Sequence, residues 1–334
     1  MPLTTIGDLS LSTAFLQRST ALKQTLDRYS GELSSGQTIE IHKRLGGNYA
    51  IVADIDHQLT QLDGHAVASA EAASTATALQ SSLDRVQTLA QDLAGALFVG
   101  SPGNSATAAG VTAKQAREDF ATVVSTLNTA VAGRTIFAGT AVKTTPLADA
   151  ETILAGLSTA LAGLTDAGDI QTAADAWFGS GGGFETTMYQ GSSTDLAAID
   201  ISETRSVALS VRADAQVFRD VLKETALVAL STDAALAIPE GEAKILRQDA
   251  GGNLWTANER LTKLRGDIGF VQQRIEQTQA EQATSRLGLE GARSSLLSVD
   301  PYETATRLED AQNQLRTMFQ VFARSSNLRL VNFL

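Results

Sequence analysis

The sequence contains no cysteine, only five prolines among 334 residues, and few aromatic side chains, which make up 5% of the chain. Without cysteine there can be no disulfide, thiolate zinc site or cysteine nucleophile. Proline breaks helices, so this scarcity leaves long stretches free to be helical. Much of the hydrophobic content, 43% of the residues, is Ala and Leu, both strong helix formers. The composition therefore favours long helices.

An excess of basic residues is also missing. The net charge is −11, the pI is about 4.8, and no cluster of Lys and Arg occurs. Proteins that bind nucleic acid or anionic membranes usually carry a basic stripe, so neither is expected as a partner. No run of about 18 apolar residues predicts a membrane span. Residues 1–20 lack the basic start, apolar run and cleavage site of a secretory signal, so no cleaved signal peptide is predicted.

No set of residues predicts catalysis, a cofactor or a metal. His57 and His65 share a predicted helix, but their spacing turns them about 80° apart, so we interpret them as surface histidines. Residues 156–160 nearly match a nucleophile elbow, yet Ser158 lies inside a helical pattern and no histidine follows it. The glycine-rich residues 179–183 lack a P-loop lysine and are interpreted as a linker. The sequence therefore predicts no enzyme activity.

Both ends of the chain carry amphipathic helix patterns. An apolar seam with three- and four-residue spacing predicts an N-terminal helix that Gly36 ends; its members are Phe15, Ser19, Leu22, Leu26, Tyr29 and Leu33. At the other end, Asp300, Pro301 and Glu303 predict an N-cap, a first helical residue and a capping-box partner. The seam of this C-terminal helix consists of Leu308, Ala311, Leu315, Met318 and Phe322.

Two longer helices are predicted between the ends, at about residues 50–98 and 254–296. The second would span about 60 Å and implies a rod-like coiled coil or bundle. The middle of its seam is polar, so weaker packing is expected there, at Thr278, Gln282 and Ser285. A further helix follows a capping box at Thr112 and Gln115.

The centre of the chain has a different character. An extended segment and turn are predicted at 134–147, two small helices within 150–178, a loop at 180–183, strands at 184–189, 196–201 and 206–211, and a helix at 216–236. Residues 141–205 contain two basic and nine acidic residues, a balance of −7, which indicates a solvated surface.

The predicted fold is therefore mainly α with a smaller α+β centre, in which long terminal helices form a coiled-coil or rod-like bundle. We expect three domains. A terminal assembly domain would comprise 1–45 and 300–334. A helical rod domain would comprise 46–140 and 206–299. An acidic α+β outer domain would comprise 141–205.

The thin terminal seams have two interpretations. They can pack on each other as an ordinary bundle core, or they can await other subunits. A helix with a narrow seam and few partners is marginal alone, so assembly would supply the missing burial. Composition leaves both open. The residues predicted for subunit contacts are Leu22, Leu26, Tyr29, Leu33, Leu308, Leu315, Met318, Phe319, Phe322, Leu328 and Leu330.

Three segments resemble the flagellin family. They are 300–334, beginning Asp-Pro-Tyr-Glu-Thr; 26–36, Leu-Asp-Arg-Tyr-Ser-Gly-Glu-Leu-Ser-Ser-Gly; and 133–140, Gly-Arg-Thr-Ile-Phe-Ala-Gly-Thr. The C-terminal segment is most similar to hook-associated, hook–filament junction subunits of the FlgL type. Residues 37–48 depart from the stretch usual in filament flagellins, which favours the junction type. A divergent filament flagellin remains the alternative.

The resemblance implies a structural protein of the extracellular flagellum, exported unfolded through the flagellar type III channel without a cleaved signal peptide. Its partners would be copies of itself in a ring or helical layer, a second hook-associated junction protein, flagellin, and a cytoplasmic export chaperone. From another class, a soluble coiled-coil signalling protein also suits long helices rich in Ala, Ser and Gln. The strands and glycine-rich loops of the centre count against it.

Overall fold

The structure is a computed structural model that describes residues 6–99 and 106–331. The chain divides into two compact units. Unit 1 comprises residues 1–62 and 283–334, and unit 2 comprises 63–282. Two long helices, α3 (Ala50–Val99) and α8 (Glu240–Leu297), contribute residues to both units. Helices dominate, with two small antiparallel sheets in unit 2, so the predicted fold class is confirmed.

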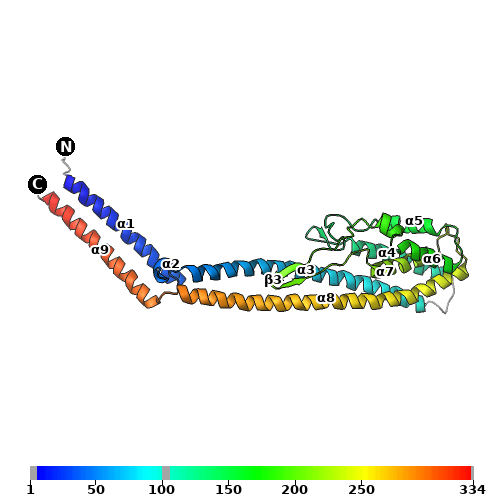
Figure 1. The fold of residues 1–334 in the computed structure, drawn as a ribbon. Helices are drawn as coiled ribbons and strands as arrows, with labels where there is room; N and C mark the ends of the chain where they lie inside the picture. Colours follow the sequence, from blue (N-terminus) through cyan, green and yellow to red (C-terminus); the bar gives the residue numbers. More distant parts are fainter. Residues whose placement is uncertain (1–5, 100–105, 332–334) are drawn as a thin grey trace. The chain divides into compact units, whose positions relative to one another are not determined.

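In unit 1, the two terminal helices pack against each other (Figure 1). They are α1 (Ile6–Ser35) and α9 (Pro301–Val331). Gly36 follows α1 with φ +69°, a conformation that glycine adopts without strain, so it ends the helix as predicted. The Asp300 carboxylate accepts hydrogen bonds from the backbone N–H groups of Tyr302 and Glu303, at 2.8 and 3.2 Å. The predicted N-cap is therefore present, whereas the Glu303 carboxylate pairs with Arg307.

The connections beside these helices are hydrogen-bonded to each other. Thr38 N–H donates to the Leu297 carbonyl at 2.8 Å, and Val299 N–H donates to the Gly36 carbonyl at 3.0 Å. The carboxylate of Glu32, which is buried, accepts from the Thr38 hydroxyl and from Ile39 N–H. The short helix α2 (Ile41–Arg44) follows. The helices are thus interrupted at two places, residues 36–40 and 298–300, and backbone hydrogen bonds join these two breaks.

Unit 2 is a helical bundle with one buried core. Helix α4 (Ala106–Leu127) packs on α7 (Gln216–Leu230), and α5 (Ala150–Leu161) packs on α6 (Ala167–Phe178). Fully buried Phe120, Phe137 and Phe218 contribute to this core, in which the ring of Phe137 meets the ring of Phe218 edge-on. The two small helices predicted within 150–178 are therefore present.

Within unit 2, polar side chains join α3 to α8. The Gln80 amide donates to the Arg265 carbonyl at 2.7 Å, and the Gln87 amide donates to Asn258 at 2.8 Å. The Arg265 guanidinium in turn donates to the side-chain amide oxygen of Gln87 at 2.6 Å. These bonds flank a buried apolar row, so the two helices have one defined register.

A hairpin docks on the polar part of the α8 seam, which corrects the expectation of weak packing at Thr278 and Gln282, whereas Ser285 is exposed. Strands β3 (Ile199–Ser202) and β4 (Arg205–Val207) form this hairpin. The Gln282 amide donates to the Ile201 carbonyl at 2.6 Å, and Ser69 donates to the same carbonyl at 3.4 Å. These polar side chains supply hydrogen bonds to the backbone of the hairpin, so the hairpin can pack against the two helices at this point.

The remaining differences concern local boundaries. The predicted strand at 184–189 is wrong, because 184–188 form a turn of π-helix, η1 (Phe184–Met188), whose Phe184 packs on Phe178. The predicted strands at 196–201 and 206–211 are shorter, and the extended 134–147 segment retains only the two-residue β2 (Arg134–Thr135), paired with β1 (Ala130–Val131).

The predicted starts of two helices are also wrong. The capping box at Thr112 is absent, because Ala106–Leu127 is continuous helix and the Thr112 hydroxyl bonds the Ala108 carbonyl. Helix α8 begins well before residue 254, and its Gly251 lies buried against Leu97 of α3. A Cβ atom at this position would lie 3.4 Å from Leu97, an ordinary contact distance, so the packing does not itself require a glycine.

Candidate assembly interface

The candidate functional site is the pair formed by α1 and α9 in unit 1. The pair is antiparallel, because Phe15 near the start of α1 meets Phe322 near the end of α9. The heptad-like spacing of both segments explains this, since residues three or four positions apart lie on one helix face. The sequence thus folds both ends into amphipathic helices whose apolar faces meet.

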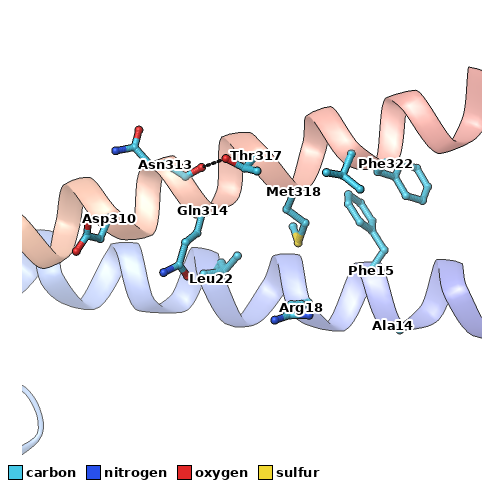
Figure 2. Close-up of a pocket in the computed structure, with 11 residues that line it drawn as sticks. Ala14, Phe15, Arg18, Leu22, Asp310, Asn313, Gln314, Thr317, Met318 and Phe322 are labelled. Carbon is cyan, nitrogen blue, oxygen red and sulfur yellow. Dashed lines mark hydrogen bonds between the residues drawn. The ribbon is translucent and has the colours of Figure 1, made fainter.

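Three phenylalanines form the aromatic part of the interface. The ring of Phe15 stacks on Phe322 with centroids 4.0 Å apart, and meets the edge of Phe319 at 5.6 Å. Figure 2 shows Phe15 pointing from α1 toward Phe322 and Met318 of α9. Aromatic pairs in such geometries contribute about 0.5–1.5 kcal/mol beyond their buried area. This cluster therefore anchors the contact between the two chain ends.

An open groove of about 770 Å³ runs between the two helices. Its apolar lining includes Phe15, Leu22, Met318, Val321 and Phe322. Polar side chains also line it, and Figure 2 shows Arg18, Asp310, Asn313, Gln314 and Thr317. A groove with apolar walls and a polar edge is suited to receive a further helix.

The predicted contact residues are only partly covered by this pairing. Leu22, Leu26, Tyr29, Leu308, Leu315, Met318 and Phe322 are all half-buried. Leu33 and Phe319 stay exposed, with 39% and 45% of their surfaces accessible. The side chains of Leu328 and Leu330 lie outside the described residues. Full burial in the seam is confined to smaller or polar side chains such as Ser19, Ala311 and Thr304.

Three exposed apolar residues of the α1–α9 pair are not among the predicted contact residues. Leu16 is 60% exposed, Val321 is 61% exposed and Tyr302 is 84% exposed. They fall outside the three- and four-residue rows, so a search for one seam omits them. The signal available was that apolar residues occur next to the seam, as with Leu16 beside Phe15. The pair thus has apolar surface on more than one face.

Charge is concentrated where the two helix breaks meet. The Glu40 carboxylate pairs with Lys43 and with Arg28, both at 2.8 Å. The hydrogen bond from Lys43 and the nearby Arg28 charge lower the pKa of Glu40. The guanidinium of Arg28 also lies over the Tyr29 ring, 4.6 Å from its centroid. These contacts hold α2 against the end of α1.

Within residues 6–99 and 106–331, no group of three metal-ligating side chains is close enough to hold an ion. In the same part of the chain, no helix has the length and apolar character needed to cross a membrane. Of the predicted surface histidines, His57 is exposed and His65 is half-buried.

Comparison with known structures identifies the fold. FlgL from Bacillus cereus superposes with a TM-score of 0.50 at 14% identity, covering 71% of this chain and 97% of that one. A provisionally assigned flagellar hook-associated protein from Vibrio parahaemolyticus gives a TM-score of 0.47 at 13% identity, covering 73% and 94%. At such identities the likeness concerns the fold alone. No curated protein matches the sequence.

The family is shown by two sequence models. The bacterial flagellin N-terminal helical region matches residues 6–142, and the bacterial flagellin C-terminal helical region matches residues 252–334. Together they cover well over half of the chain, in the order found in that family, and they include both helices of the antiparallel pair. The chain therefore belongs to the bacterial flagellin family and is a structural subunit of the flagellum.

Proposed function

We propose that this subunit is the adaptor that joins the flagellar hook to the filament. Three features support the junction position over the filament itself. Residues 37–48 depart from the filament type, the C-terminal segment resembles junction subunits, and the fold is that of FlgL from Bacillus cereus. Its mechanism is coupled folding and assembly, in which the terminal helices become fully buried only between subunits.

The observation that carries this proposal is the incomplete burial of the α1–α9 seam. Its large apolar side chains are half-buried or exposed, and the open groove leaves Phe15, Met318 and Phe322 accessible. Each apolar side chain that becomes buried contributes about 1.5–3 kcal/mol. Several such residues in one groove therefore favour association strongly. The predicted contact residues, including Leu328 and Leu330, are proposed to meet neighbouring subunits.

The proposal extends to partners, location and chemistry. The partners are copies of this chain in a ring or helical layer, a second hook-associated junction protein, flagellin, and a cytoplasmic chaperone for the C-terminal helix. The protein works in the extracellular flagellum after export without a cleaved signal peptide. It has no catalytic activity. Residues 1–45 with 300–334, 46–140 with 206–299, and 141–205 are its assembly, rod and outer domains.

The function is tested in cells that lack the protein. Loss of a junction subunit lets cells export flagellin that cannot attach, so flagellin accumulates in the medium. Loss of a filament subunit leaves the hook-associated proteins in place on the hooks. Electron microscopy of hooks together with immunoblots of the medium separates these outcomes. Normal filaments on the deletion strain would refute the junction proposal.

A point variant tests the role of the terminal helices. Phe322→Asp places a charge beside Phe15, so we expect the variant to be exported but not incorporated into flagella. Unit 2 lies outside the change and should keep its thermal unfolding transition. Gln320→Asp, on an exposed position of the same helix, is the matched control and should complement the deletion. Wild-type flagella carrying Phe322→Asp would contradict the assigned contact.

The filament subunit remains the alternative within the family, because the matching family models describe flagellin itself. In that case the protein would be the main component of sheared filaments, whereas a junction subunit would be a trace component confined to their hook-proximal ends.

A further inference from the structure

Unit 2 contains an apolar pocket that the described residues leave unfilled. The pocket has a volume of about 260 Å³ and lies between α3, the β1–β2 hairpin and the segment that leads into β3. Its apolar lining is formed by Val131, Ile136, Val142, Leu196, Ile199 and Leu209. A dry cavity of about 150 Å³ already accepts benzene in another protein, so this pocket has room for an aromatic side chain.

The edge of the pocket is charged. Arg134 and Glu71 line it and form an ion pair at 2.9 Å, with 54% and 58% of their side-chain surfaces exposed. Exposed ion pairs of this kind contribute little to stability and can be rearranged at low cost. Glu71 is therefore available to a cation that approaches the pocket from outside.

The same unit exposes an aromatic side chain that suits this pocket. Phe270 of α8 is 60% exposed, whereas Ile268 and Ile275 on the same helix are buried. The guanidinium of Arg274 lies 5.2 Å from the centroid of the Phe270 ring. Phe270 and Arg274 thus form an apolar tip with an adjacent positive charge, on an exposed face of α8 opposite the buried Ile268 and Ile275.

We propose that Phe270 of one copy inserts into this pocket of the next copy, with Arg274 pairing with Glu71 at the edge. The two surfaces match in polarity, since an exposed phenylalanine meets an aliphatic pocket, and in charge, since a cation flanks the phenylalanine and a carboxylate flanks the pocket. The inference rests on the proposed function only in taking a second copy of this chain as the occupant.

Phe270 and the pocket lie within one stretch of the helix pair. On α3, the pocket residues Glu71 and Thr75 lie between Ser69 and Gln80. On α8, Phe270 lies between Arg265 and Gln282. Ser69 bonds Gln282, and Gln80 bonds the Arg265 carbonyl, so these two hydrogen bonds bound the same stretch on both helices. Phe270 and the pocket therefore belong to the part of unit 2 in which α3 and α8 are bonded to each other.

When copies are related by one repeated step, such a contact joins two different surfaces and is heterologous. Heterologous contacts close into rings when the rotation between copies permits, and form helical filaments when each step also carries a shift along the axis. Either arrangement brings Phe270 of every copy to the pocket of the next.

Single-cysteine variants test the contact directly, since the natural chain has no cysteine. One variant carries Arg274→Cys and the other carries Glu71→Cys, the two exposed positions that the proposal brings together, and both variants keep Phe270. Cells that lack the native protein produce either variant alone or both together. Isolated flagella are oxidised and analysed on non-reducing gels. We expect a disulfide-linked dimer when both are present and essentially none with either alone, because like positions do not meet in a heterologous contact.

A second measurement uses the purified full-length chain. Phe270→Ser should weaken its self-association by about tenfold or more, the effect of withdrawing one buried phenylalanine from the contact. Trp255→Ser is the matched control, since Trp255 is 54% exposed on the same helix, and it should leave self-association unchanged. Sedimentation at a series of concentrations measures both.

The outcomes separate this inference from the proposed function. Equal cross-linking by each single variant, or no cross-link in flagella that grow filaments normally, would overturn the Phe270 contact and leave the junction function intact. Equal sedimentation of Phe270→Ser and the unsubstituted chain would also overturn it. Failure of the deletion strain to release flagellin would instead count against the junction function.

Discussion

At the scale of single residues, Glu224 is the most unusual group in unit 2. Its side chain is 1% exposed, and one carboxylate oxygen accepts from Lys223, Gln171 and Asn253 at 2.8–3.0 Å. The other carboxylate oxygen of Glu224 and the side-chain amide oxygen of Gln171 are buried without hydrogen-bond partners. Burial raises the pKa of Glu224 above its usual value of 4.5, against the lowering effect of Lys223. The side chain links α6, α7 and α8 at the cost of burying a charge.

This environment predicts that stability depends on pH. A carboxyl with a raised pKa in the folded state binds more protons folded than unfolded, so stability falls as pH rises from about 4.5 toward the folded pKa. Glu224→Gln removes the titratable carboxyl, and with it this pH dependence, but keeps a side-chain oxygen that can accept the hydrogen bonds. We expect its unfolding free energy to gain about 1 kcal/mol or more over the unsubstituted protein between pH 4.5 and pH 8.

Chemical denaturation of both proteins across that pH range measures the difference. Glu259→Gln, which changes an exposed carboxylate on α8, is the control and should leave the pH profile unaltered. A constant difference between Glu224→Gln and the unsubstituted protein at all pH values would contradict the assignment.

Gly139 predicts a second residue-scale effect. Its φ is +58°, and a Cβ atom there would lie 2.5 Å from the Thr194 carbonyl oxygen and 2.8 Å from that of Ser192. Gly139→Ala should therefore destabilise unit 2 by about 2–4 kcal/mol, through strain and steric overlap together. Gly133 has φ +78° with open space around it, so Gly133→Ala should cost only about 1 kcal/mol. Thermal unfolding of the two variants tests the difference.

At the scale of elements, the β3–β4 hairpin depends on the helices beneath it. A two-stranded hairpin is marginally stable alone, and this one is bonded through the Ile201 carbonyl to Gln282 and Ser69. Arg205 of β4 also pairs with Glu281 of α8 at 2.7 Å. The position of the hairpin is therefore set by polar side chains. In the helical sequence pattern alone, the polar seam residues among them predicted weaker packing.

Removing the main bond should release the hairpin. Gln282→Leu leaves the Ile201 carbonyl without its shortest hydrogen bond, which costs about 1–3 kcal/mol for a buried group. We expect faster amide hydrogen exchange at 199–207 while α4 and α7 stay protected. Ser285→Ala, at an exposed position of the same predicted seam, should leave exchange unchanged. Slow exchange in both variants would show that Gln282 is dispensable.

At the scale of the whole molecule, the two units differ in how completely they bury apolar surface. The core of unit 2 contains many fully buried aromatic and aliphatic side chains. In the α1–α9 pair, the large apolar side chains are half-buried at best. Unit 2 therefore contains a self-sufficient core, and the terminal helices gain most from contacts with other molecules.

Limited proteolysis of the purified monomer should show this difference. We expect loss of about the first 40 and last 30 residues before any cleavage within the core of unit 2, because low local burial permits opening. Mass spectrometry of the surviving fragment locates the boundaries. Resistance of the full-length chain would mean that α1 and α9 form a stable pair by themselves, and the case for folding upon assembly would be lost.

The sequence by itself determined the periodic features of this protein. The three- and four-residue rows predicted α1, α3, α8 and α9, and Gly36 and Asp300 marked two of their ends, because helix periodicity and capping depend on residues near in sequence. The segments at both termini and at 133–140 also indicated the flagellin family. The predicted subunit contacts remain a prediction, since they concern molecules beyond the chain.

Only the tertiary structure decided which long-range contacts these helices make. The pairing of Phe15 with Phe322, the docking of the β3–β4 hairpin on Gln282 and the pocket beside Glu71 each join residues far apart in sequence. The sequence-based strand at 184–189 failed for the same reason, since packing of Phe184 against Phe178 favours a helical turn there. Local preferences amount to a few tenths of a kcal/mol per residue, whereas burying one large side chain contributes about 1.5–3 kcal/mol, so packing prevails wherever the two disagree.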